Sequence, residues 1–240
     1  AICMMRSATP LISAAMLLLA LTAPAVADYG EARARYQALP EEQQLDIAYA
    51  LIASGDFEGL AEHGFTRTLY RAITAFERRG GVAPDGGPDR EQRARLKEVS
   101  QSFYAKLGNK YYTHPVTGAR LLVPRRLFDQ EKPTPEGMLF SRRDGMFSLI
   151  FLSFRDSDKS FDELWDTLTA ETGGRRVIYE RRFASHFVAT GFFKGRKFYT
   201  WMARTGNSTT GFSVSWGAPW EETGRKVSTL LANAFRTGRD

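Results

Sequence analysis

The sequence predicts an α+β protein: a small three-helix domain followed by an antiparallel-sheet domain that carries two helices. Apolar residues recur at helical spacing over residues 40–108. By contrast, residues 119–240 are rich in alternating aromatic and β-branched side chains, as strands are. Charge divides the chain similarly, because residues 28–108 carry 11 Lys and Arg against 13 Asp and Glu, whereas residues 109–240 carry 21 against 14. We therefore expect two domains, joined by a linker at residues 109–118.

The first 27 residues are typical of a secretory signal peptide. An apolar run at residues 11–21 follows Arg6, and the small residues Ala25-Val26-Ala27 are those that a signal peptidase reads. The run is too short to cross a hydrocarbon core, so we expect no stable membrane span after cleavage. The mature chain should begin at Asp28 and contain no cysteine, since Cys3 lies in the removed part.

Three amphipathic segments predict the helical domain, which residues 28–39 precede. The first begins after Pro40 and ends at Gly55, whose freedom to adopt a positive φ suits a helix end. The second covers residues 66–79. The third begins at Asp89, a residue type that caps helix N-termini.

The second domain is predicted to contain strands in the order strand, strand, helix, four strands, helix. Ser160 caps its first helix, and Glu163 completes a capping box. The strands are expected at residues 120–124, 146–154, 177–181, 185–193, 197–204 and 211–216, and the helices at residues 160–172 and 221–236.

Three short motifs follow one another in the helical domain: Gly64-Phe65, then Ala72-Ile73, then Asp85-Gly86. In this order and spacing the segment resembles the peptidoglycan-binding-like domain, a three-helix cell-wall module of bacterial amidases, muramidases and many secreted proteins. The resemblance implies that peptidoglycan, or another anionic envelope component, is the partner. The departures from the family are Thr66, Leu69 and Glu77, where it usually has glycine, threonine and glutamine.

The same resemblance implies a glycan groove with Phe57, Phe65, Arg67 and Tyr70 as its wall residues. An aromatic face stacks on a sugar ring, and an arginine can hold a carboxylate of the peptide stem with two hydrogen bonds. A purely structural role is the alternative, because both phenylalanines also suit the core and Arg67 also suits a solvated surface.

The second domain resembles the Mog1/PsbP-like fold in its opening Val123-Pro124 strand and in a hairpin that ends at Asp144-Gly145. The whole chain is similar to secreted alphaproteobacterial proteins that join the two kinds of domain through a segment at residues 115–120. This resemblance implies a periplasmic or secreted protein of a Gram-negative bacterium.

Basic and aromatic residues alternate in the second domain, which lies in the half of the chain, residues 109–240, that has a net charge of +7. Export makes nucleic acid an improbable partner, so an outward basic face would meet an anionic envelope component. The residues expected on this face are Arg181, Arg182, Arg196 and Lys197.

No catalytic, metal or cofactor site is recognised in the sequence, and we expect a non-enzymatic protein. The histidines lie in separate segments without metal-ligand spacing, and the crowded carboxylates lie at a helix start, where the helix dipole favours acids. A cell-wall hydrolase, or an accessory to one, with its active groups in the second domain is the alternative. The residues concerned are His63, His114, His186, Asp156, Asp158, Asp162 and Glu163.

Overall fold

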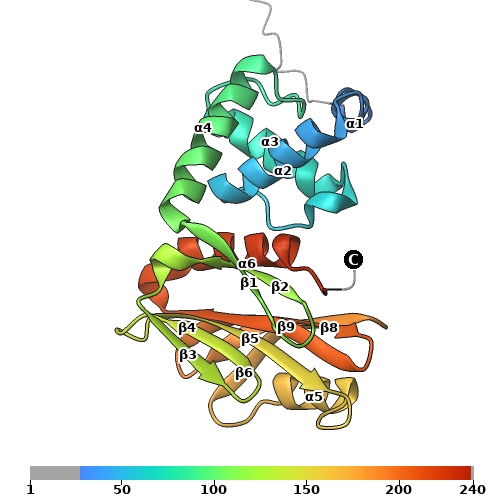
Figure 1. Cartoon of the computed structure of the whole chain (residues 1–240). Coiled ribbons are helices and arrows are strands. Elements are labelled where there is room, and N and C mark those ends of the chain that lie inside the picture. Colours follow the sequence, from blue (N-terminus) through green and yellow to red (C-terminus); the bar gives the residue numbers. More distant parts are fainter. Residues whose placement is uncertain (1–27, 239–240) are drawn as a thin grey trace, which may run out of the picture.

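The computed structural model describes residues 28–238 and shows a helical module on top of a sheet module (Figure 1). The predicted signal peptide, residues 1–27, lies outside the described residues, so its cleavage stays a prediction. Within residues 28–238, none of the helices combines the length and the apolar character that a membrane crossing requires.

The helical module contains the expected three helices and one more. Gly55 ends the first expected helix with a φ of 85°, and Asp89 and Gln92 form a reciprocal capping box at the start of the third. The additional helix is formed by the N-terminal segment, residues 28–39, where Asp28 caps it. The helices are α1 (Tyr29–Gln37), α2 (Glu41–Ser54), α3 (Arg67–Arg79) and α4 (Arg90–Leu107), with a short 3-10 turn at Ala61–His63.

The segment predicted as a linker, residues 109–118, is part of a β-hairpin instead. Helix α4 ends at Gly108, and β1 (Asn109–Thr113) begins at once and pairs antiparallel with β2 (Arg120–Pro124). Most side chains of β1 are at least partly exposed, so this strand lacks the buried apolar residues by which a strand is recognised in a sequence. The two modules are therefore joined by regular structure.

The sheet module is a seven-stranded antiparallel sheet in the order β3-β4-β5-β9-β8-β7-β6. All strands expected after residue 119 are present, and two further strands, β3 and β4, lie at one edge. The Asp144-Gly145 hairpin joins β4 to β5, as predicted. The elements are β3 (Gln130–Thr134), β4 (Gly137–Ser141), β5 (Phe147–Arg155), α5 (Phe161–Thr169), β6 (Arg175–Arg182), β7 (His186–Phe193), β8 (Arg196–Thr205), β9 (Ser208–Trp216) and α6 (Glu221–Ala234).

Each face of the sheet carries one of the two helices. On one face, here called the α5 face, Phe161 of α5 packs against Phe187 with their ring centres 5.3 Å apart. On the opposite face, called the α6 face, Phe235 at the end of α6 packs against Trp201 at 4.9 Å. The capping box of Ser160 and Glu163 starts α5 as predicted.

Helix α6 lies between the sheet and the helical module, where it packs against α2 (Figure 1). The side chain of Asn233 is buried and joins the two modules, because its Oδ1 accepts a hydrogen bond from the Ala61 amide (2.7 Å) and its Nδ2 donates to the Gly59 carbonyl (3.0 Å). A single cluster of buried apolar residues extends from Ala32 to Phe235. The predicted two domains thus share one hydrophobic core.

Candidate functional site

Two of the four predicted glycan-groove residues belong to the core of the helical module. Phe57 is 2% exposed and Phe65 is 7% exposed, so neither presents a ring to a ligand. Phe65 is covered by α1, whose Tyr36 ring lies 5.1 Å from it. The functional assignment of these two residues is thereby corrected, and their structural explanation holds.

The other two predicted residues lie beside α1 rather than along an open groove. The guanidinium of Arg67 sits 4.8 Å above the ring of Tyr29, the first residue of α1. Tyr70 is partly buried, with its ring edge-on to Tyr29 at 5.4 Å. The sequence analysis did not predict α1. The groove implied by the resemblance would therefore lie on a surface that α1 covers.

The four predicted basic-face residues do not form one face. Arg181 and Arg182 are neighbours on β6, so their side chains point to opposite faces of the sheet. The register places Arg181 beside Val188 and Trp201 on the α6 face, and Arg182 beside Phe187 on the α5 face, where Asp162 pairs with it.

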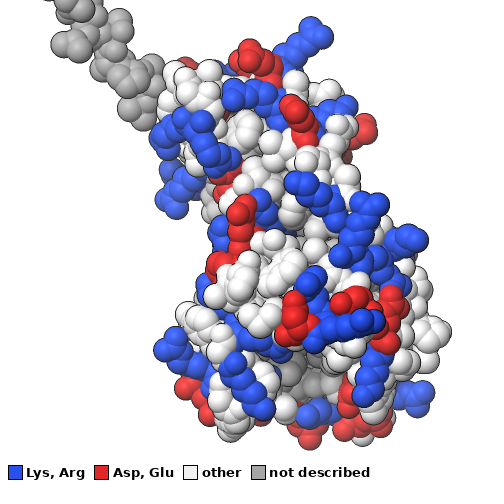
Figure 2. All heavy atoms as spheres, turned by 90° about the vertical axis from the view of Figure 1, so that its left-hand side faces the viewer, with Lys and Arg blue, Asp and Glu red and all other residues white. Residues whose placement is uncertain are grey.

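Arg196 and Lys197 lie at the far end of the sheet and are also split between its faces. Arg196 donates to the Gly145 carbonyl, and Lys197 forms an ion pair with Glu221 of α6 at 2.5 Å. On the side of the molecule seen in Figure 2, Lys and Arg are scattered over both modules and interleaved with Asp and Glu. On this side of the molecule the positive charge is therefore dispersed and not collected in a patch.

A cleft lies where the helical module meets the α6 face of the sheet. It consists of two adjoining cavities of about 470 and 380 Å³, which share four lining residues. One wall is formed by α6 together with residues 58–63 of the helical module, and the floor is formed by β6, β7 and β8. We call it the inter-module cleft; its shared residues are Glu58, Tyr179, Tyr199 and Thr229.

Large apolar side chains line this cleft without being fully buried. Ile178 is 61% exposed, Tyr179 51% and Phe183 39%, although all three belong to residue types that are usually covered. The Phe183 ring stacks on His186 at 4.4 Å, and His186 lies nearly parallel to Trp201 at 5.9 Å. Three aromatic rings therefore stack on one another along the floor, and the half-exposed Tyr179 also lines the cleft.

Charge is distributed unevenly along the cleft. At the end of the cleft near the start of β8, Lys197 is paired with Glu221, and Arg225 is paired with Glu58. At the other end, Arg181 lies with its guanidinium 4.9 Å above the Phe183 ring, and within residues 28–238 it has no carboxylate partner. This end of the cleft is accordingly positive.

The cleft also unites two histidines that are far apart in the sequence. His63, from the 3-10 turn of the helical module, and His186, from the start of β7, line the same cavity. Burial lowers the pKa of His186 below its usual value, so its ring is neutral at pH 7. His114 lies elsewhere and stacks on Phe151 at 5.1 Å. No spacing rule could have predicted this pair, because the packing of the modules brings the two together.

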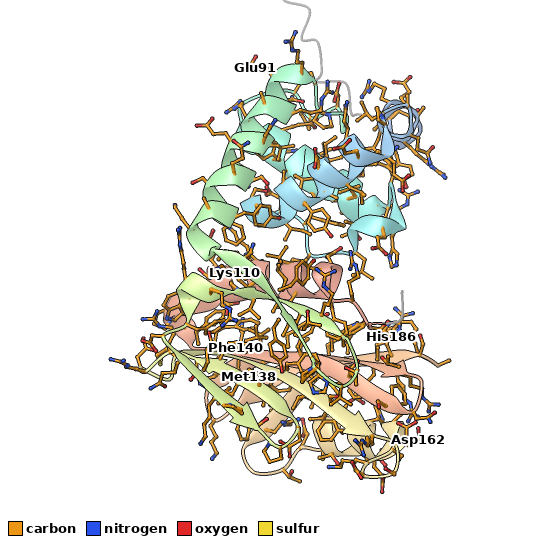
Figure 3. The ribbon with its side chains drawn as sticks, in the orientation of Figure 1. Glu91, Lys110, Met138, Phe140, Asp162 and His186 are labelled. Atoms are coloured by element: carbon orange, nitrogen blue, oxygen red, sulfur yellow. The ribbon has the colours of Figure 1, made fainter. Side chains whose placement is uncertain are left out.

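The carboxylate cluster at the start of α5 is separate from these histidines. Figure 3 shows His186 at the sheet on the side of α6, whereas Asp162 lies on α5, beyond the opposite face. Asp162 binds Arg182, and Glu163 accepts hydrogen bonds from Ser160, which lower its pKa. Within the described residues, no three His, Cys, Asp or Glu side chains are grouped so that they could hold a metal ion.

No protein-family model matches the chain, and no curated protein matches it. Among solved structures it is similar to cyanobacterial PsbP (CyanoP) from Synechocystis sp. PCC 6803. The sequence identity is 14%, the match covers 54% of this chain and 92% of CyanoP, and the TM-score is 0.41.

Proposed function

We propose that this is a non-enzymatic, periplasmic or secreted protein that binds peptidoglycan, or another anionic envelope polymer, in the inter-module cleft. The supporting observation is the row of partly exposed rings on the cleft floor, which includes Tyr179, Phe183 and Trp201. Exposed aromatic side chains can pack against sugars, and clefts between packed modules are common ligand sites. The helical module contributes residues 58–63 of the wall rather than the groove implied by its resemblance.

Exposure of these side chains has a cost that a ligand would offset. Each apolar side chain left in water forgoes about 25 cal/mol for each Å² that burial would remove. Tyr179, Phe183, Ile178 and Leu60 are all more than a third exposed, and all four line the same cleft. Exposed apolar side chains that are gathered in one place mark binding surfaces, whereas scattered ones do not.

A groove between α2 and α4, of about 620 Å³, is the competing site for the polymer. It is larger than either half of the cleft, and amides and charged side chains line it together with Tyr49 and Tyr104, which are partly buried and whose hydroxyls donate to backbone carbonyls. Among its residues are Gln101 and Lys97, which supply a matched control for the cleft.

The experiment is co-sedimentation of the mature chain with purified peptidoglycan sacculi. The double variant Tyr179→Ala/Phe183→Ala should lose at least about five-fold in affinity, since each lost stacking contact contributes about 0.5–1.5 kcal/mol. The control variant Lys97→Gln/Gln101→Ala should bind like the parent. Equal binding by the parent and the cleft variant, or loss in the control alone, would contradict the proposal.

A hydrolase is the second candidate because His63 and His186 line one cavity. A neutral His186 could serve as a general base, and its Nδ1 already lies 3.2 Å from the Ser185 hydroxyl. Release of soluble fragments from sacculi by the parent chain, abolished in His186→Gln, would favour this candidate over the non-enzymatic one.

A further inference from the structure

We infer that the inter-module cleft is selective for an acidic oligosaccharide, with Arg181 holding a sugar carboxylate while the neighbouring sugar ring stacks on Tyr179. This inference rests on the proposed function, because it concerns the ligand of the same cleft. It adds a charge requirement and names the residue that imposes it.

The charge requirement follows from the pairing of the cleft's cations. Lys197 and Arg225 are each neutralised by a glutamate that lies in the cleft wall. Arg181 instead rests on the Phe183 ring at 4.9 Å, which leaves the donors of its guanidinium edge available to an anion. A guanidinium binds a carboxylate with two parallel hydrogen bonds, and such a pair is stronger than one between neutral groups.

The sugar requirement follows from the groups beside Arg181. Tyr179 lies two residues before Arg181 on β6, so both side chains point to the α6 face, and the Tyr179 side chain is 51% exposed. Side chains with hydroxyl groups, Tyr179 and Thr190 among them, line the half of the cleft that lies near the start of β8. Flat apolar surfaces with hydroxyls at their margins suit a sugar, which has both an apolar face and a rim of hydroxyl groups.

An extended acidic peptide is the competing ligand, and the edge strand β6 argues against it. A peptide would gain most by adding a strand to this edge. However, β6 contains a bulge between Val177 and Tyr179, and arginines occupy both of its ends. Bulges and edge charges are devices that prevent strand addition. The cleft floor therefore recognises its ligand through side chains.

Calorimetric titration of the mature chain with galacturonic acid trimer and with its methyl ester tests the inference, since the ester has an uncharged methyl carboxylate group in place of each charged carboxylate. The acid should bind at least about ten-fold more tightly than the ester, equivalent to ~1.4 kcal/mol. Arg181→Gln should abolish this difference. Arg182→Gln is the matched control, because it removes the same charge from the neighbouring position on the opposite face of the sheet.

Equal affinity for the acid and the ester, or equal losses in Arg181→Gln and Arg182→Gln, would overturn the inference. Tighter binding of a triglutamate peptide than of the acid trimer would also overturn it, in favour of a peptide ligand. Failure of the inference is distinguishable from failure of the proposed function. If sacculi still bind through Tyr179 and Phe183 while the acid and the ester bind equally, only the selectivity for a carboxylate is lost.

Discussion

Glu77 is a buried carboxylic acid in α3. Its Oε2 accepts a hydrogen bond from the Gly86 amide at 2.9 Å, but its Oε1 is buried without a partner. Burial, together with the negative charge of nearby Asp85, raises the pKa of Glu77 to about 7, although the hydrogen bond from the Gly86 amide acts in the opposite direction. A glutamine would keep the accepting oxygen and carry no charge.

The stability of the protein should therefore fall as the pH rises from about 4.5 to about 7. In this window the unfolded chain releases the Glu77 proton while the folded chain retains it, so a higher pH favours unfolding. The loss should reach at most about 3 kcal/mol. Glu77→Gln should remove this dependence and be more stable than the parent at pH 8. The measurement is urea unfolding at pH 5 and pH 8.

Glu98→Gln is the control for this experiment, because Glu98 is an exposed residue of α4. It should leave the pH dependence of the parent unchanged. A Glu77→Gln protein that is less stable than the parent at pH 8 would show that the carboxylate makes a contribution that burial does not account for.

At the scale of single elements, α6 depends on one polar side chain. Asn233 is 4% exposed and is hydrogen-bonded to Gly59 and Ala61 in the helical module, as well as to the Thr229 carbonyl of its own helix. Of these groups, the Ala61 amide is buried, so removal of the Asn233 side chain leaves it without its partner. A buried donor or acceptor left without a partner costs about 1–3 kcal/mol.

Asn233→Ala should accordingly destabilise the protein by about 2–4 kcal/mol, measured by urea unfolding at pH 7. The matched control is Asn207→Ala, at an exposed position in the turn between β8 and β9, which should change stability by less than about 0.5 kcal/mol. A loss in Asn233→Ala no larger than that of the control would mean that the apolar contacts of α6 alone hold the modules together.

The elements that were predicted correctly are those with local chemical signals. Asp89 and Ser160 cap their helices with side-chain hydrogen bonds, and Gly55 adopts the positive φ that ends α2. The missed elements lack such signals: α1 has no continuous apolar face, and β3 is almost entirely exposed and contains Pro133. An edge strand with exposed side chains is stabilised by its neighbour, which a local sequence pattern does not contain.

At the scale of the whole molecule, the candidate site could not be predicted because it belongs to neither module alone. The sequence identified Arg181 and His186 as individual residues, but it gave no reason to join them to His63 or to residues 58–63. That proximity arises because the C-terminal helix α6 returns to pack between α2 and the sheet. Likewise, the burial of Phe57 and Phe65 depends on tertiary contacts, including those with α1.

The shared core leads to an expectation about unfolding: the two modules should unfold in one cooperative transition. The buried cluster is continuous from Ala32 to Phe235, so separating the modules would expose apolar surface of α2 and α6 to water. All four tryptophans lie in the sheet module, at positions 165, 201, 216 and 220, whereas most helical residues lie in the helical module. Tryptophan fluorescence and circular dichroism at 222 nm therefore report on different modules.

In a urea titration of the mature chain, the two signals should give the same midpoint and the same slope. A fragment of residues 28–108 should show weak or no cooperative unfolding, because its α2 surface would lack the cover of α6. Two separated transitions in the mature chain, together with a cooperative fragment, would show that the helical module is stable by itself. In that case the inter-module cleft could open, and its ring-lined floor would no longer be a fixed binding surface.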